Sequence, residues 1–267
     1  MFTCSEEHLE YLKKIKRKRY LIILGRISIA GIFIFLWELF SQLGMINTFL
    51  FSSPSRILST FISLFQQGNL LKHVEITLFE VFLSFLFTSV IGLFIATILW
   101  SNEILAKLID PYITILNSLP KVALGPLIII WVGARIHSII FMAIMISIFV
   151  TILTIYQGFI SVNANLILML KCFGANRWQI FRKIIFPSNL MVIISSLKIN
   201  VSMSLIGVIM GELLVSKRGL GYLIMYGSQV FQIDLVITSV CILGIISYFM
   251  YYLLNLLETY FNHHINL

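Results

Sequence analysis

The sequence predicts an all-α, polytopic membrane protein with about six transmembrane helices. Of its 267 residues, 59% are hydrophobic and 11% are charged, and the mean hydropathy is +1.00. A soluble domain carries about 25% charged residues, so this chain does not have the polar surface that water would require. The apolar runs are also long, and about 20 apolar residues suffice for a helix to cross a bilayer.

Residues 1–19 form a basic segment that ends in KKIKRKR. This segment lacks the short apolar run and small-residue cleavage site of a signal peptide. We expect the first span at about residues 20–40, with the basic segment retained in the cytoplasm.

Five further spans are expected, at about residues 74–100, 104–132, 136–158, 190–212 and 234–257. Together the six spans make a transmembrane domain over residues 20–258, followed by a cytoplasmic tail over 259–267. The third span contains NSLPK, where Pro120 removes a backbone hydrogen bond and should kink or split the helix. Because freed carbonyl groups in a membrane need partners, the break should face the bundle or a cavity.

The basic residues support a cytoplasmic N-terminus and C-terminus, because positive charge favours the cytoplasmic side. With this topology, the outer segments hold five basic residues: Arg56, Lys72, Arg135, Lys217 and Arg218. The inner segments hold eleven: Lys13, Lys14, Lys16, Arg17, Lys18, Arg19, Lys107, Lys171, Arg177, Arg182 and Lys183.

The longest inner loop, at about residues 160–188, is expected to form two short helices around a turn. Gly174 can adopt the left-handed conformation that ends a helix. An apolar stripe with helical spacing follows, and Pro187 should end the second helix; the stripe consists of Ala175, Trp178, Phe181 and Ile185. Such a basic and aromatic pair of helices can lie in the lipid interface or insert into a groove on a soluble partner.

The fifth span has one polar and small-residue face, with members three or four positions apart: Ser196, Asn200, Ser204, Gly207 and Gly211. This face can pack against another helix, since Gly207 and Gly211 form a GxxxG motif, or it can line a pathway. Glu212, at the outer edge of this span, is a functional candidate because carboxylates are costly near a membrane. Glu80 in the second span can equally pair with a basic residue such as Lys198.

Several classes of site receive no support from the sequence. There is no GxxxxGK[ST] phosphate loop, no arguable serine–histidine–carboxylate set and no metal-ligand spacing among the three cysteines. His263 and His264 are interpreted as exposed residues of the tail, and no metal site is expected.

The stretch FGANRWQIFRKIIFPSNL resembles the coupling loop of inner-membrane permeases of ABC importers. Four further stretches resemble the nitrate/sulfonate/taurine group of these permeases: FLFSSPSRIL, SLPKVALGPLIIIWVG, YQG and GELLVSKRGLGYLI. The resemblance extends from about residue 50 to residue 258.

The resemblance implies a type I ABC importer permease fold in a multi-pass protein of the cell inner or plasma membrane. It implies three kinds of partner besides the lipid bilayer: a second copy of the chain, two cytoplasmic ABC ATPase subunits and an extracytoplasmic solute-binding protein. ATP and magnesium would bind in the ATPase, so this chain needs no cofactor, is not an enzyme and binds no nucleic acid. The solute would be small and anionic, such as a sulfonate, taurine or nitrate.

The resemblance also implies two groups of site residues. The coupling loop would use Leu168, Gly174, Ala175, Arg177, Trp178, Phe181, Arg182 and Pro187. The translocation pathway or gate would use Pro120, Ser196, Asn200, Ser204, Gly207, Gly211 and Glu212.

The coupling motif departs from the family pattern at one place. The Glu-Ala-Ala positions fall on Leu168, Met169 and Leu170, so the usual acidic residue is absent. Docking would then depend on shape, apolar contact and basic residues, and we expect Gly174, Trp178 and Phe181 to form the part that enters the ATPase.

Three alternatives to this function remain open. A secondary transporter or channel working alone would often show inverted repeats, and none is convincing here. A membrane enzyme would need clustered catalytic groups. The same type of permease could also be dedicated to a vitamin precursor.

Overall fold

The computed structural model describes residues 6–265, and it describes side chains for residues 14–18 and 20–260. The ends of the basic segment and of the tail, with the side chains of His263 and His264, lie outside this description. Over the described residues the secondary structure is helical without strands, which confirms the all-α prediction. The chain forms two compact units, Met1–Ser63 and Leu64–Leu267.

The first unit holds a long helix, a four-residue helix and most of a third helix. Helix α1 covers Glu6–Gln42, α2 covers Thr48–Phe51, and α3 begins at Pro54 and ends at Gln66. Glu38, near the end of α1, accepts hydrogen bonds from the backbone N–H of Ser55 at 3.0 Å and from Gln42 at 2.9 Å. The carboxylate therefore joins the end of α1 to the first turn of α3, where helix N–H groups lack partners.

The second unit contains four unbroken helices that are long and apolar enough to span a membrane. They are α4 (Asn69–Ser101), α7 (Ile136–Ile160), α11 (Leu190–Val215) and α13 (Ile233–Ile265). With α1 and one broken span, the number of candidate spans is six, as predicted.

The broken span is the one that contains Pro120. Helix α5 (Glu103–Ser118) meets a 3-10 turn (Lys121–Leu124) and α6 (Gly125–Val132), and the two parts are bent by 84°. The expected split is thus present. Pro120 is exposed in the single subunit, so the expectation that the break faces the bundle or a cavity stays a prediction. The carbonyl of Asn117, beside the break, accepts a hydrogen bond from Lys121 Nζ at 2.9 Å.

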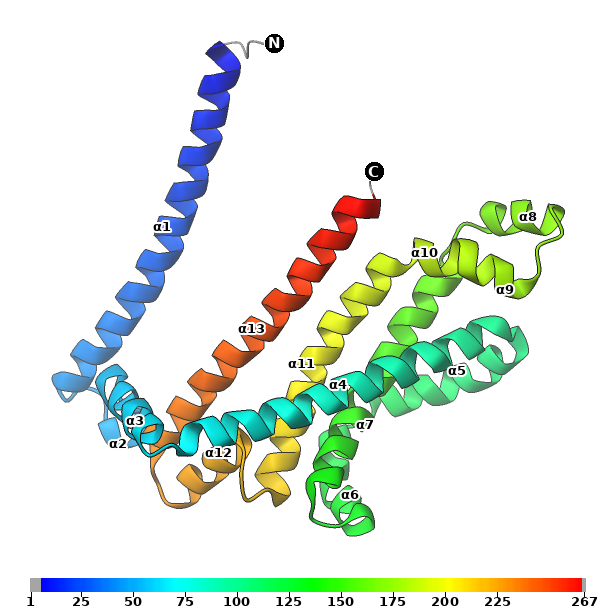
Figure 1. The fold of residues 1–267 in the computed structure, drawn as a ribbon. Helices are drawn as coiled ribbons and strands as arrows, with labels where there is room; N and C mark the ends of the chain where they lie inside the picture. Colours follow the sequence, from blue (N-terminus) through cyan, green and yellow to red (C-terminus); the bar gives the residue numbers. More distant parts are fainter. Residues whose placement is uncertain (1–5, 266–267) are drawn as a thin grey trace. The chain divides into compact units, whose positions relative to one another are not determined.

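Short helices occur at both ends of the second unit (Figure 1). Helices α8 (Ala164–Cys172) and α9 (Arg177–Ile180) lie at the end where α7 finishes, and α6 and α12 (Leu220–Gln229) lie at the opposite end. Helix α12 was not expected from the sequence. The C-terminal end of α13 lies at the same end of the unit as α8 and α9 (Figure 1).

Small residues bring the central helices of the second unit close together. A Cβ atom added to Gly207 would lie 2.4 Å from the Cα atom of Ala143, and one added to Gly211 would lie 3.0 Å from the Cα of Ile139. Only glycine permits this approach of α11 to α7. The α7–α11 pair is therefore the centre around which α4 and α13 pack.

Candidate functional site

The turn between α8 and α9 is built as the sequence predicts. Gly174 adopts φ +74°, a left-handed conformation that favours glycine. Its neighbour Ala175 donates its N–H to the carbonyl of Leu170 at 3.0 Å, closing the end of α8. Asn176 then starts α9 through a capping box with Gln179, in which each side chain accepts a backbone hydrogen bond at 2.8 Å. The turn therefore has a fixed shape.

Phe181 anchors this turn in the core of the second unit. Its ring is 8% exposed and lies within 5.4–6.0 Å, between ring centroids, of four aromatic rings; these rings belong to Trp100, Phe159, Trp178 and Phe186. The expectation that Phe181 forms part of an exposed plug is therefore wrong. The three-residue spacing places Phe181 beside Trp178, but the side chain of Phe181 is buried in the core of the unit.

Other side chains of the α8–α9 turn are strongly exposed. Trp178 is 65% exposed, and Phe173, at the tip beside Gly174, is 81% exposed. Leu168 and Met169, at the positions of the Glu-Ala-Ala motif, are also exposed. Sequence reasoning missed Phe173, although its position directly before the turn glycine was a usable signal. The apolar stripe thus divides into an anchored part and an exposed part.

The basic residues of the loop differ in role. The Arg177 guanidinium donates to the carbonyl of Ser101 at the end of α4, which ties α9 to the bundle. Arg182 and Lys183 are exposed. Pro187 lies in the short helix α10 (Phe186–Ser188), which directly continues a π-helical turn (Phe181–Ile185). This helical run ends at Ser188, one residue after Pro187, close to the expected end.

The polar face of α11 is buried inside the unit. Asn200 is fully buried, and its Nδ2 donates to Ser89 Oγ at 2.8 Å, while Ser204 Oγ lies 3.1 Å from Asn200 Oδ1. Ser196 is also buried. Together with Gly207 and Gly211, these residues pack against α4 and α7, so the structure supports the helix-packing alternative for this face.

Glu212 holds the segment that follows α11. Its carboxylate accepts from Thr77 Oγ1 at 2.7 Å and from the N–H of Gly221 at 2.6 Å. The Thr77 hydroxyl also accepts from the N–H of Leu220 at 2.9 Å. A Cβ on Gly219, which has φ +103°, would lie 2.3 Å from the Glu212 carboxylate. The buried Glu212 carboxylate thus connects α4, α11 and α12 through hydrogen bonds. The sequence did not reveal these partners.

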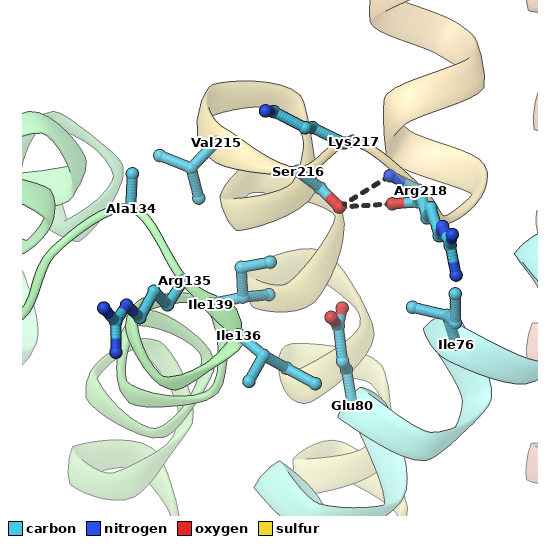
Figure 2. A pocket seen from close by; sticks show the side chains of 10 residues that line it. All are labelled: Ile76, Glu80, Ala134, Arg135, Ile136, Ile139, Val215, Ser216, Lys217 and Arg218. Atoms are coloured by element: carbon cyan, nitrogen blue, oxygen red, sulfur yellow. Dashed lines mark hydrogen bonds between the residues drawn. The ribbon is translucent and has the colours of Figure 1, made fainter.

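Glu80 and Lys198 do not pair. Lys198 Nζ forms an ion pair with Glu258 and donates to Asn255 Oδ1 at 2.9 Å, which joins α11 to α13. Glu80 is 2% exposed and borders a cavity at the end of the unit that carries α12 (Figure 2). The suggested Glu80–Lys198 contact is therefore wrong.

Comparison with known proteins gives a family match over residues 88–266, to the family described as "Binding-protein-dependent transport system inner membrane component". A probable ABC transporter permease protein of Haemophilus influenzae is 29% identical over 86% of this chain and 93% of its own length. A putative aliphatic sulfonates transport permease protein, SsuC of Bacillus subtilis, is 26% identical over 88% of this chain and 84% of its own length.

Solved structures support the same fold. A bacterial ABC transporter involved in import of the acidic polysaccharide alginate matches with a TM-score of 0.65 and 17% identity, over 94% of this chain and 98% of that one. A chain of the MetNI methionine ABC transporter matches with a TM-score of 0.61 and 20% identity, over 75% and 97%. The broken span, the α8–α9 turn and the family match lead to one conclusion: the chain belongs to the binding-protein-dependent transport system inner membrane components and is a permease of the ABC importer type.

Proposed function

We propose that two copies of this chain form the translocation pathway of an importer driven by two cytoplasmic ATPase subunits. Both termini and the α8–α9 turn would lie in the cytoplasm, and residues 216–219 would face outward, where a solute-binding protein delivers the solute. ATP and magnesium would bind in the ATPase. One structure of similar fold is a bacterial alginate ABC transporter in complex with a pentasaccharide-bound periplasmic protein, which supports the outer partner.

The α8–α9 turn carries this proposal. A coupling element must be rigid, connected to the transmembrane helices and exposed to its partner. Phe181 and Arg177 supply the connection to Trp100, Phe159 and the end of α4. Phe173 and Trp178 supply exposed aromatic surface, which is typical of residues that dominate protein interfaces. With Leu168 in place of the usual acidic residue, the docking surface is largely apolar.

The solute is proposed to be a small organic anion of the sulfonate type. Two relatives of this chain, in Bacillus subtilis and Escherichia coli, are named as aliphatic sulfonate transport permeases. A vitamin or vitamin precursor is the second candidate, because other relatives are named for transport of formylaminopyrimidine and riboflavin. A secondary transporter that works alone is disfavoured, since the exposed and anchored turn would then have no partner.

The docking assignment is tested by recovery of the ATPase with purified permease variants. Phe173→Ala and Trp178→Ala should each weaken binding roughly thirtyfold, because an aromatic anchor contributes about 2 kcal/mol. Phe94→Ala is the matched control, since Phe94 lies on α4 and is 65% exposed, as is Trp178. Equal ATPase recovery and equal transport by all variants would remove the assignment. Unchanged ATPase recovery together with reduced contact of the α8–α9 turn with lipid would instead favour a loop that lies in the lipid interface.

A further inference from the structure

Helix α5, which precedes the break, carries three separate stripes of side chains. Its buried stripe includes Ala106 and Ile113, which pack against α4 and α7. A second stripe is apolar and exposed, with Leu108 61% and Ile115 58% exposed. The third stripe is polar, recurs every three or four residues and continues past the end of the helix; it consists of Asp110, Thr114, Asn117, Ser118 and Lys121.

The polar stripe of α5 is not covered within the subunit. Asp110, Thr114 and Ser118 are exposed, and Asn117 and Lys121 are partly exposed. Polar side chains inside a membrane face protein or a water-filled cavity, because lipid offers them no hydrogen-bond partner. The exposed apolar stripe beside it already gives α5 a face for lipid. The polar stripe is therefore suited to a different surrounding.

The Lys121 ammonium lies near the middle depth of the membrane span. Its Nζ atom is over the face of the Phe149 ring, 5.8 Å from the ring centroid. Phe149 lies near the middle of the 25-residue helix α7. At about 1.5 Å per residue, it is about 16 Å or more from either end of that helix. The ammonium is therefore beyond the reach of lipid headgroups.

Neutral oxygens hold this ammonium. Lys121 Nζ donates to the carbonyl of Asn117 at 2.9 Å and to Asn117 Oδ1 at 3.1 Å. With the carboxylates of the described residues, Lys121 forms no ion pair. An ammonium has three N–H donors, and two of them are used here. A charge without a counterion at this depth is costly, and such residues usually mark a pathway for substrates or ions.

We propose that Lys121 is the fixed positive charge of the translocation pathway and that the polar stripe of α5 faces the water in that pathway. The anionic group of a solute would accept a charge-assisted hydrogen bond from the Lys121 ammonium near mid-membrane depth. A cationic solute would be repelled at the same point. Lys121 therefore determines the sign of the charge that crosses the membrane, after the binding protein has selected the solute.

This inference rests on the proposed function, because the pathway between two copies of the chain is what would enclose the polar stripe. The test requires neither the ATPase nor the solute-binding protein, and the oligomeric state of each sample is measured by mass photometry. A monomeric sample would contradict the proposed function and with it this inference. In a dimeric sample, the reactivity of the stripe tests the inference alone.

The test measures the reactivity of single cysteines in the full chain, without its native cysteines, in lipid nanodiscs. The probes are two impermeant methanethiosulfonates, one with an anionic sulfonatoethyl group and one with a cationic trimethylammonioethyl group. Thr114→Cys and Ser118→Cys should react with them, whereas Ile115→Cys, at the same depth on the apolar stripe, should not. Ser118→Cys should favour the anionic reagent at least about fivefold, relative to the rate ratio for free cysteine, because a nearby positive charge attracts one reagent and repels the other.

Variants of Lys121 show whether its charge causes this preference. Lys121→Gln in the Ser118→Cys chain should remove the preference, and Lys121→Arg should keep it. Lys107→Gln is the control, since Lys107 is an exposed cation of α5 outside the polar stripe. If Lys121 only supports the break through Asn117, Lys121→Gln would lower the Tm and leave the preference unchanged. A rise in ionic strength should also reduce the preference, and this measurement needs no change at Lys121.

Three results would overturn the inference. The first is a dimeric sample in which Ser118→Cys reacts no faster than Ile115→Cys, which would place the polar stripe against protein or lipid. The second is reaction at Ser118→Cys without a preference for the anionic reagent, or with a preference that ionic strength does not change. The third is a preference that survives in Lys121→Gln.

Discussion

Gly207→Ala tests whether the polar face of α11 packs or lines a pathway. Gly207 lies in α11, where the added Cβ would be 2.4 Å from the Cα atom of Ala143 and 2.9 Å from its Cβ. The nearest atom belongs to the backbone of α7, so no side-chain rotation can relieve the contact. In an open pathway, by contrast, a single methyl group would be accommodated without moving a helix.

The size of the effect follows from this geometry. Carbon atoms pack best at about 3.5–4.0 Å, so α7 and α11 would have to separate by roughly 1 Å near Gly207. A gap of 0.5–1 Å already removes about a quarter to a half of the dispersion energy of the atoms that face it. Val208 and Leu205 are buried beside this contact and would share the loss. We expect destabilisation of about 1–3 kcal/mol, the usual range for overpacking.

The assay is thermal unfolding of the purified chain in detergent, with Gly244→Ala as the matched control. Gly244 also lies in a spanning helix, α13, but a Cβ there would have no atom within 4 Å. Gly207→Ala should lower the Tm by several degrees, whereas Gly244→Ala should leave it unchanged or raise it slightly through helix propensity. Equal Tm values for the two variants would refute the packing interpretation and return Gly207 to the candidate pathway residues.

Three other predictions concern contacts between helices and the membrane topology. Thr77→Val should lower the free energy of unfolding by about 1–3 kcal/mol, because Glu212 and the N–H of Leu220 both lose a buried partner. Thr77→Ser keeps the hydroxyl and should have no such effect, so equal Tm values for the two variants would contradict these hydrogen bonds. In a background without native cysteines, single cysteines at 176 and 217 should react with an impermeant maleimide from opposite sides of the membrane; labelling from one side would disprove the topology. Lys198→Met and Glu258→Gln should show a coupling energy on the order of 1 kcal/mol in a double-mutant cycle of thermal unfolding, and additive effects would argue against their ion pair.

The long helices could be predicted from the sequence because spanning a bilayer imposes length and apolarity on a continuous segment. The expected span at 136–158 corresponds to Ile136–Ile160, and the expected span at 190–212 corresponds to Leu190–Val215. Helix α12 was missed because its ten residues are too few to span a membrane and its GLGYL start reads as a turn. Short helices at a membrane surface lack the hydropathy signal that identifies spans.

The partners of the buried polar side chains could not be predicted from the sequence. Glu212 was identified as a candidate because a carboxylate sits at the edge of a span, but its partner Thr77 lies 135 residues earlier. That pairing depends on how deep α4 and α11 sit relative to each other and on how each is rotated about its axis. The pattern of residues in one sequence specifies neither quantity. The same is true of Lys198, which lies within reach of Glu258 rather than Glu80.

The burial of the α11 face has a physical cause. A polar side chain in a membrane needs a partner, and a neighbouring helix can supply one. Asn200 satisfies this need through Ser89 and Ser204, while Gly207 and Gly211 provide the close approach that brings polar groups of adjacent helices within hydrogen-bond distance. Small and polar residues at helical spacing therefore indicate packing first.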